Sequence, residues 1–466
     1  MLYSYNMDDI ENLLINASTN GNIDVLIELL NQNADIETKN KNKNDYTLLH
    51  CASINGHLNV VLELLKRNAN PNVTNKDNTS PLHNASKNGH LDIVLELLKH
   101  NANPNAENNA NVTPLHCATF GGHKEIIVEL LNQNICINAK DSTGSTLLHI
   151  ASLKGHLDIV IYLLDQKADI ESKNKNGHTP LHITLENNNI NIVQELLNRN
   201  ANINTQNNKG NTLLHDASYK GSEDFVLELL KHKADTEIEN KNRGKPLHHA
   251  SYHNHINIVK ELLNHNANVK SKDKDGNTPL HIASFCGNVN IVKELLNNNA
   301  NIEATNSYIE TSLICASHKG NIDVVVELLN HNANINAKNF RYNTSLHGAL
   351  TNKHNNVVLE LLKRDADVMV MNKSGKTPYD IALLHNYTPE IISLLRPNKL
   401  KDNIVEKDNI KYINSLVKRT ICPICFVNKR CIIYNCGHFN CVDCSEKISK
   451  CSECLVAITS RKLLCS

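Results

Sequence analysis

The residues best suited to chemistry are cysteines gathered near the end of the chain. Of the fourteen cysteines in this sequence of 466 residues, nine fall between Cys422 and Cys465. One or two residues separate the members of each successive ligand pair, a spacing that lets both donor atoms bind one tetrahedral ion. The four pairs are Cys422 with Cys425, Cys436 with His438, Cys441 with Cys444, and Cys451 with Cys454. Eight ligands predict two zinc ions.

These zinc ions are predicted to be structural. Each ion would have four protein ligands, so no coordination position is left for a hydrolytic water. A segment of about 45 residues buries too little apolar surface to fold alone. Structural zinc contributes roughly 10–16 kcal/mol per site in small modules. We therefore expect two structural Zn²⁺ ions as the cofactors, and activity that depends on the surface they shape. Cys431 and Cys465 fall outside the pairs and are predicted to be ordinary thiols.

The order and intervals of the ligands resemble those of the RING finger. The run from Cys436 to Cys454 is similar, more narrowly, to the RING of inhibitor-of-apoptosis proteins. The PHD and LIM arrangements place their histidine at a different point in the series. The resemblance implies interleaved sites, in which one ion binds Cys422, Cys425, Cys441 and Cys444 and the other binds Cys436, His438, Cys451 and Cys454.

RING domains of this kind dock a ubiquitin-conjugating enzyme and promote transfer of ubiquitin to a substrate lysine. The resemblance implies apolar docking positions at Ile424 and Ile448. Two further positions depart from the pattern, because Ser452 replaces the usual Pro and Leu455 stands where an Arg often bridges to ubiquitin. Tails like 455–466 pair two RINGs, which implies a homodimer; closing the RING core is the alternative role for this tail.

The first 400 residues repeat one motif. Its histidine recurs at steps of 33 residues, at His50, His83, His116, His149, His182, His215, His248 and His281, and again at His347. In the copy 79–105, a short apolar segment begins at Ser80-Pro81, a turn follows at Gly89, and Ile93, Val94, Leu97 and Leu98 then recur at helical spacing. Each copy therefore predicts two short helices, and about twelve copies are present.

Length, paired helices and the Thr-Pro-Leu-His-x-Ala signature resemble the ankyrin repeat over residues 11–396. The resemblance implies a stacked solenoid that binds a protein through its surface. Where the family usually has Gly after the second helix, most copies have Asn, which tolerates positive φ. Lys167, Lys233 and Asp365 fit this position less well, so we expect some loss of stability in those copies. The histidines at fixed register are predicted to be structural, as are His57, His90, His123 and His156.

Composition excludes several functional classes. Basic and acidic residues balance at 48 each, and aromatics reach only 4%, which argues against nucleic acid as a partner. The alternative is that nucleic acid binds the basic segment 396–466, which has 13 Lys/Arg and 6 Asp/Glu. No run of 18 apolar residues and no signal-peptide pattern is present, so we expect a cytoplasmic protein without a membrane contact.

The predicted fold is mostly α. It comprises a solenoid over 1–396, a linker with a short helix over 397–420, and a small α+β RING domain with its tail over 421–466. The resemblance implies a ubiquitin ligase that acts by positioning, without a catalytic residue or covalent intermediate of its own. The alternative is a non-catalytic adaptor. Hairpin tips near Val73–Asp77, Lys140–Gly144 and Lys272–Gly276 differ little, so the substrate-binding residues are not assigned.

Overall fold

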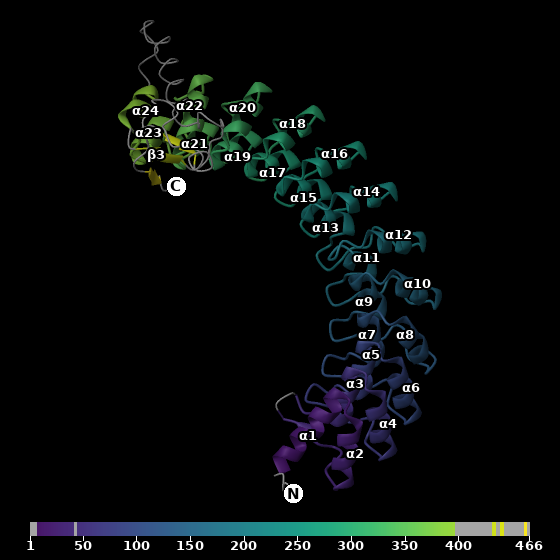
Figure 1. Cartoon of the computed structure of the whole chain (residues 1–466). Helices are drawn as coiled ribbons and strands as arrows, with labels where there is room; N and C mark the ends of the chain where they lie inside the picture. Colours follow the sequence, from purple (N-terminus) through teal and green to yellow (C-terminus); the bar gives the residue numbers. More distant parts are fainter. Residues whose placement is uncertain (1–6, 42–43, 397–430, 435–438, 442–460, 464–466) are drawn as a thin grey trace. The chain divides into compact units, whose positions relative to one another are not determined.

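The repeats fold as pairs of short helices. The computed structural model describes residues 7–41, 44–396, 431–434, 439–441 and 461–463. In this part of the chain 24 helices form 12 successive pairs, as the 33-residue spacing predicted (Figure 1). The first helices of the pairs are α1 (Met7–Asn20), α3 (Leu48–Asn55), α5 (Pro81–Asn88), α7 (Pro114–Gly121), α9 (Leu147–Lys154), α11 (Pro180–Ile183), α13 (Leu213–Lys220), α15 (Pro246–Tyr252), α17 (Pro279–Cys286), α19 (Ser312–Lys319), α21 (Ser345–Thr351) and α23 (Pro378–Leu384).

The second helices carry the longer apolar stripes. They are α2 (Ile23–Asn31), α4 (Leu58–Lys66), α6 (Leu91–Lys99), α8 (Lys124–Leu131), α10 (Leu157–Asp165), α12 (Ile190–Asn198), α14 (Glu223–Lys231), α16 (Ile256–Asn264), α18 (Val289–Asn297), α20 (Ile322–Asn330), α22 (Asn355–Lys363) and α24 (Pro389–Leu394). Every described helix has between 4 and 14 residues. In the portion of the chain that the structure covers, no helix has the length and apolar character needed to cross a membrane.

The chain divides into two compact units. One comprises 1–217 and 222–241, and the other 218–221 and 242–466. Within the first unit, α3, α5, α7 and α9 lie side by side in one layer, with α4, α6, α8 and α10 in the next, and the hairpin loops project beyond the first layer (Figure 1). Within the second unit, α17, α19 and α21 follow one another, and α18, α20 and α22 form their second layer.

The local sequence explains where each helix begins. Ser80 has extended backbone, Pro81 occupies the first helical turn, where no amide donor is needed, and His83 completes a capping box with Ser80. Buried residues of α5 and α6 then fill the core between the two helices and their neighbours. In this copy Leu82, Ala85, Ile93, Val94 and Leu97 are at most 1% exposed.

Most copies have glycine at the turn between the paired helices. Gly89 ends α5 with φ of 81°, in the left-handed region. A Cβ atom at this position would lie 2.5 Å from Cε1 of His123 in the next copy. The glycine therefore serves two purposes, because it adopts the turn conformation and lets the next histidine approach the backbone.

The prediction of a left-handed residue after the second helix is confirmed. Asn101 has φ of 62°, and the other asparagines at this register lie in the same region. Lys167, Lys233 and Asp365, which were expected to fit less well, adopt it too, with φ of 65°, 62° and 60°. The conformation is thus imposed by the repeat and not by the residue type.

Successive hairpin tips are joined through their main chains. In the first unit the Ser142 amide donates to the Ala110 carbonyl at 2.8 Å, and the Lys175 amide to the Thr143 carbonyl at 2.9 Å. In the second unit the Ser307 amide donates to the Asp275 carbonyl at 2.9 Å. This series of bonds, which we call the tip ladder, fixes each tip against the one before it.

The described residues include five short strands. In the first unit, β1 (Lys39–Asn40) pairs antiparallel with β2 (Tyr46–Thr47). Near the end of the chain, β3 (Cys431–Tyr434) pairs with β4 (Phe439–Cys441) and with β5 (Arg461–Leu463), both antiparallel, in the order β4-β3-β5. The predicted linker over 397–420 lies outside the described residues.

Candidate functional site

The predicted zinc ligands lie almost entirely outside the described residues. Cys441 is the last residue of β4, where its backbone pairs with that of Cys431. The other seven ligands, Cys422, Cys425, Cys436, His438, Cys444, Cys451 and Cys454, lie beyond the described part, as do Ile424, Ile448, Ser452 and Leu455. The zinc sites and the docking positions therefore remain predictions. Within the described residues, no group of three or more His, Cys, Asp or Glu side chains is placed to hold a metal ion.

The backbone of this segment nevertheless has a defined order. Residues 435–438 connect β3 to β4 and include Cys436 and His438, whereas Cys441 ends β4. The three-residue strand β4 therefore follows the second ligand pair and ends at the first ligand of the third pair. Residues 461–463 of the expected tail pair with β3 of the same chain.

The histidines at fixed register are structural, as predicted. The Thr47 amide donates to Nδ1 of His50 at 3.2 Å, so the proton lies on Nε2. That Nε2 donates to the Thr79 carbonyl at 2.8 Å, which joins one copy to the hairpin of the next. His83 and His281 make the same contact, at 2.9 Å to the carbonyls of Val112 and Glu310.

Burial keeps these imidazoles neutral. Removal from water lowers the pKa of His50 from 6.5 to about 4, and it lowers the pKa of His182 to about 4 as well. The same cause lowers the pKa of His83, His149 and His281. A neutral imidazole with both nitrogens engaged, as in His50, is not available as a general base or a metal ligand.

The second histidine series is structural too. Nε2 of His57 contacts the Thr19 carbonyl at 2.9 Å, and Nε2 of His90 contacts the Ile54 carbonyl at 3.0 Å, in each case in the preceding copy. His123 and His156 contact the carbonyls of Lys87 and Phe120 at 3.1 and 3.4 Å. In other copies an asparagine replaces the histidine; Asn321, for example, donates from Nδ2 to the Phe285 carbonyl at 2.9 Å.

A groove of about 590 Å³ follows the first helices of the first unit. Its lining includes Lys87, Phe120 and Leu153 from three successive copies, and Thr143 from a hairpin tip. The Phe120 ring is 47% exposed, and Nζ of Lys154 lies 3.8 Å from its centroid. The groove combines an exposed ring with ammonium groups, which suits contact with a protein chain.

The groove lacks an activated nucleophile among its described lining residues. Burial raises the pKa of the Cys117 thiol to about 12, so the thiol is protonated at neutral pH. His116 and His149, which also line the groove, are hydrogen-bonded in capping boxes with Thr113 and Thr146. The thiol is protonated and both imidazoles are engaged, so none of these three groups is poised for nucleophilic attack.

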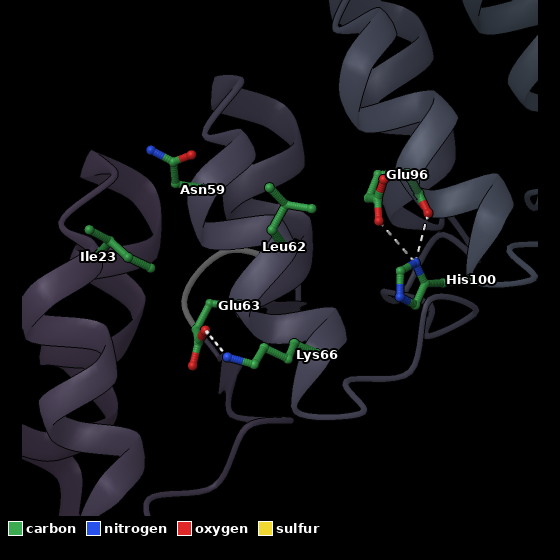
Figure 2. Close-up of a pocket in the computed structure, with 7 residues that line it drawn as sticks. All are labelled: Ile23, Asn59, Leu62, Glu63, Lys66, Glu96 and His100. Carbon is green, nitrogen blue, oxygen red and sulfur yellow. Dashed lines mark hydrogen bonds and ion pairs between the residues drawn. The ribbon is translucent and has the colours of Figure 1, made fainter.

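A second recess of about 330 Å³ lies on the second helices α2, α4 and α6 of the same unit. Figure 2 shows its titratable groups paired with neighbours three or four residues away in the chain. Nζ of Lys66 lies 3.9 Å from Oε2 of Glu63, and Nδ1 of His100 lies 3.5 Å from Oε1 of Glu96. Ion pairs that involve an exposed Lys or His in this way contribute little to stability. We assign no chemistry to this recess.

Sequence reasoning missed two hairpin tips in the second unit. The expectation that tips differ little does not hold for residues 306–309 (Asn-Ser-Tyr-Ile) and 339–342 (Asn-Phe-Arg-Tyr). We call these two segments the apolar tips. The sequence does mark these tips, because a large residue replaces a tip glycine. Ile309 and Tyr342 stand where other copies have Gly144, Gly276 and Gly375.

The apolar tips hold large residues in the left-handed region. Ile309 has φ of 57° and Tyr342 has φ of 60°. A left-handed conformation costs a residue with a Cβ atom about 1–2 kcal/mol, and the cost is most unusual for a β-branched residue. Both side chains are 52% exposed, so burial does not offset this strain.

Comparison with known proteins supports the repeats along most of the chain. A family model described as "Ankyrin repeats (3 copies)" matches residues 14–108, 82–174, 166–241, 228–306 and 313–408. Over 40 residues the chain is 50% identical to a protein of Arabidopsis thaliana named E3 ubiquitin-protein ligase RGLG4. That stretch is 9% of this chain and 10% of the plant protein, so the chain spans about a tenth of that relative's length.

Proposed function

The chain belongs to the ankyrin-repeat family, and we propose that it is a RING-type ubiquitin ligase whose solenoid binds the substrate. Ankyrin repeats are surfaces for protein partners, so the solenoid supplies the protein-binding part of this function. The C-terminal segment supplies the other part, by recruiting a ubiquitin-conjugating enzyme that carries ubiquitin. The observation that carries the proposal is the set of four ligand pairs from Cys422 to Cys454.

The donor set and the strand order both fit two zinc ions. Seven cysteines and one histidine form the set, and thiolate with imidazole is the combination that structural zinc prefers. An extended chain rises about 3.3 Å per residue, so β4 separates the pair that precedes it from the pair that begins at its end. This separation favours interleaved sites, with Cys436 and His438 on one ion and Cys441 and Cys444 on the other. Bound zinc would supply only the fold of the segment.

The proposed mechanism is positioning. The solenoid holds a protein substrate while the C-terminal segment holds the conjugating enzyme, and linkage of two binding modules raises the effective concentration of one bound partner near the other. A neutral substrate lysine then attacks the ubiquitin thioester of the conjugating enzyme, forming an isopeptide bond while the C–S bond breaks and the enzyme's cysteine leaves as the thiol. The short match to a ubiquitin ligase supports this assignment. The substitutions Ser452 and Leu455 instead favour a second candidate, a non-catalytic adaptor in which the zinc segment dimerises or stabilises the chain.

An autoubiquitination assay separates the two candidates. Purified full-length protein is incubated with activating enzyme, ubiquitin and a panel of conjugating enzymes. We expect ubiquitin chains with the wild type and none with Ile424→Ala or Cys436→Ser. Cys431→Ser, outside the ligand pairs, is the matched control and should retain activity. Failure of the whole panel with two zinc ions bound would reject the ligase and leave the adaptor.

A further inference from the structure

The apolar tips form one continuous exposed patch in the second unit. The Tyr308 and Phe340 rings have their centroids 6.0 Å apart. Tyr308 is 53% exposed and Phe340 is 36% exposed. Three aromatic rings and an isoleucine are thus exposed on two neighbouring tips, whereas the equivalent tips 141–144 and 273–276 read Asp-Ser-Thr-Gly and Asp-Lys-Asp-Gly.

The patch is held rigid before any partner binds. Oδ1 of Asn306 accepts hydrogen bonds from the amides of Tyr308 and Glu310, at 2.9 and 3.0 Å. Oδ1 of Asn339 accepts equivalent bonds from Arg341 and Asn343, each at 3.0 Å. The Phe340 amide donates to the Tyr308 carbonyl at 3.0 Å, as part of the tip ladder. Aromatic side chains on an ordered backbone lose little conformational entropy on binding, which is a property of residues that dominate interfaces.

Equivalent positions in the first unit relate the tips to the surface of the first helices. In the first unit, Phe120 and Thr143 line one groove, and their counterparts in the second unit are Phe285 and Tyr308. Phe285 is 45% exposed, and Nζ of Lys319 lies 4.3 Å from its ring centroid. By this register the Phe285 ring belongs to the same side of the repeats as the apolar tips.

Cations accompany the exposed rings. The Arg341 guanidinium lies 5.1 Å from the Phe340 centroid, and Nζ of Lys373 lies 5.1 Å from the Tyr342 centroid. The tip residues 338–342 and 372–376 contain four basic and no acidic residues. The nearby carboxylate of Glu310 contacts the amide groups of Asn306 and Asn339, at 3.4 and 3.5 Å. An apolar surface rimmed by positive charge complements apolar side chains next to carboxylates.

We propose that the apolar tips, together with Phe285, bind a segment of a partner protein that combines aromatic or aliphatic side chains with Asp and Glu. Ile309 and Tyr342 contact that segment through their exposed side chains. Residues 397–430 of this chain contain eight basic and three acidic residues, so their charge does not suit the patch. The assignment deepens the proposed function by locating the substrate surface, and it rests on that function only in calling the partner a substrate.

The test selects peptides on the intact protein. A random displayed peptide library is panned on full-length protein, and the enriched peptides are synthesised and titrated against wild type and Ile309→Gly/Tyr342→Gly. This double variant restores the glycines of other tips, so it should fold and melt at a higher temperature than wild type. We expect peptides enriched in Asp, Glu and apolar residues, binding weakened about tenfold by the double variant, and weaker binding at high salt. Lys175→Ser, on a tip of the first unit, is the matched control and should bind like wild type.

Three outcomes would overturn the assignment: enriched peptides whose binding the double variant does not change, competition by a synthetic 397–430 peptide, or a concentration-dependent dimer lost in the double variant. The last two would identify this chain's own segment or a second copy as the occupant. Lys175→Ser, which lies outside the patch, should autoubiquitinate like wild type. Peptide binding without any ubiquitin transfer would reject the ligase and retain the patch. Ubiquitin transfer without peptide binding at the apolar tips would reject the patch and retain the ligase.

Discussion

The repeats and the cysteine-rich C-terminal segment differ in where their stability comes from. In the repeats, buried leucines and registered histidines recur in copy after copy, and each copy contributes a similar share. In the C-terminal segment, eight predicted ligands would concentrate the stability in two ions. A single substitution should therefore weaken one copy of the solenoid, but it should unfold the whole zinc segment.

Removal of zinc is the change with the largest expected effect. Loss of ions that contribute about 10–16 kcal/mol per site should unfold the C-terminal segment and leave the solenoid folded. Metal analysis should find two zinc ions in wild type and fewer in Cys436→Ser, with the main helical melting transition unchanged. Cys431→Ser should keep both ions. A chelator that also melts the helices would show that the two regions do not fold independently.

Acid should weaken the solenoid through its buried histidines. Their pKa values are lower in the folded state than the unfolded value of 6.5, so folding favours the neutral form. Stability is therefore full above pH 6.5 and is lost as pH falls from 6.5 towards 4. For His50 the loss reaches about 3 kcal/mol below pH 4.

Urea unfolding at a series of pH values measures this loss. His50→Ile, which copies the residue at the Ile314 register, should flatten the pH dependence, whereas His100→Gln on the exposed face should not. An equal pH dependence in all three proteins would contradict the assignment.

Gly89→Ala should break the contact between neighbouring copies. The new Cβ combines a left-handed backbone with a position 2.5 Å from His123, so we expect a loss of about 2–3 kcal/mol in the free energy of unfolding. Gly375 has φ of 70°, but a Cβ there meets nothing within 4 Å. Gly375→Ala should thus cost only about 1 kcal/mol. Equal losses in the two variants, measured by urea unfolding, would show that the His123 contact does not matter.

Lys167→Gly should have the smallest effect, an increase in the free energy of unfolding. Lys167 already has φ of 65°, so glycine removes strain and should add about 0.5–1 kcal/mol. Asn101→Gly, at the same register, should gain less because asparagine tolerates this conformation better. Thermal melting of both variants against wild type tests the ranking, and a larger gain for Asn101→Gly would reverse it.

Periodic features of the fold could be predicted from the sequence. The step of 33 residues between His50 and His83 located the helix pairs, because one contact pattern repeats and each repetition confirms the last. The left-handed turns at Asn101 and its equivalents followed for the same reason. The zinc ligands were proposed from spacing alone and stay a prediction, since Cys441 is the single ligand within the described residues.

Features that break the period were harder to predict. Helix α11 has four residues, and Asn188, with φ of 56°, replaces the glycine of other copies beyond its end. Ile309 is left-handed although a β-branched residue disfavours this conformation. The neighbouring tips and Asn306 fix the backbone there. Tertiary context overrides local propensity at such positions, and a search for the common motif passes over them.

The tip ladder has a consequence for how this surface can evolve. Its bonds join main-chain atoms only, as between the Lys373 amide and the Arg341 carbonyl at 2.9 Å. The side chains in the middle of a tip can therefore be exchanged while the backbone that presents them keeps its place. Ser-Thr in one copy and Phe-Arg in another occupy the same scaffold. New binding preferences could arise one tip at a time, without compensating changes in the neighbouring copies.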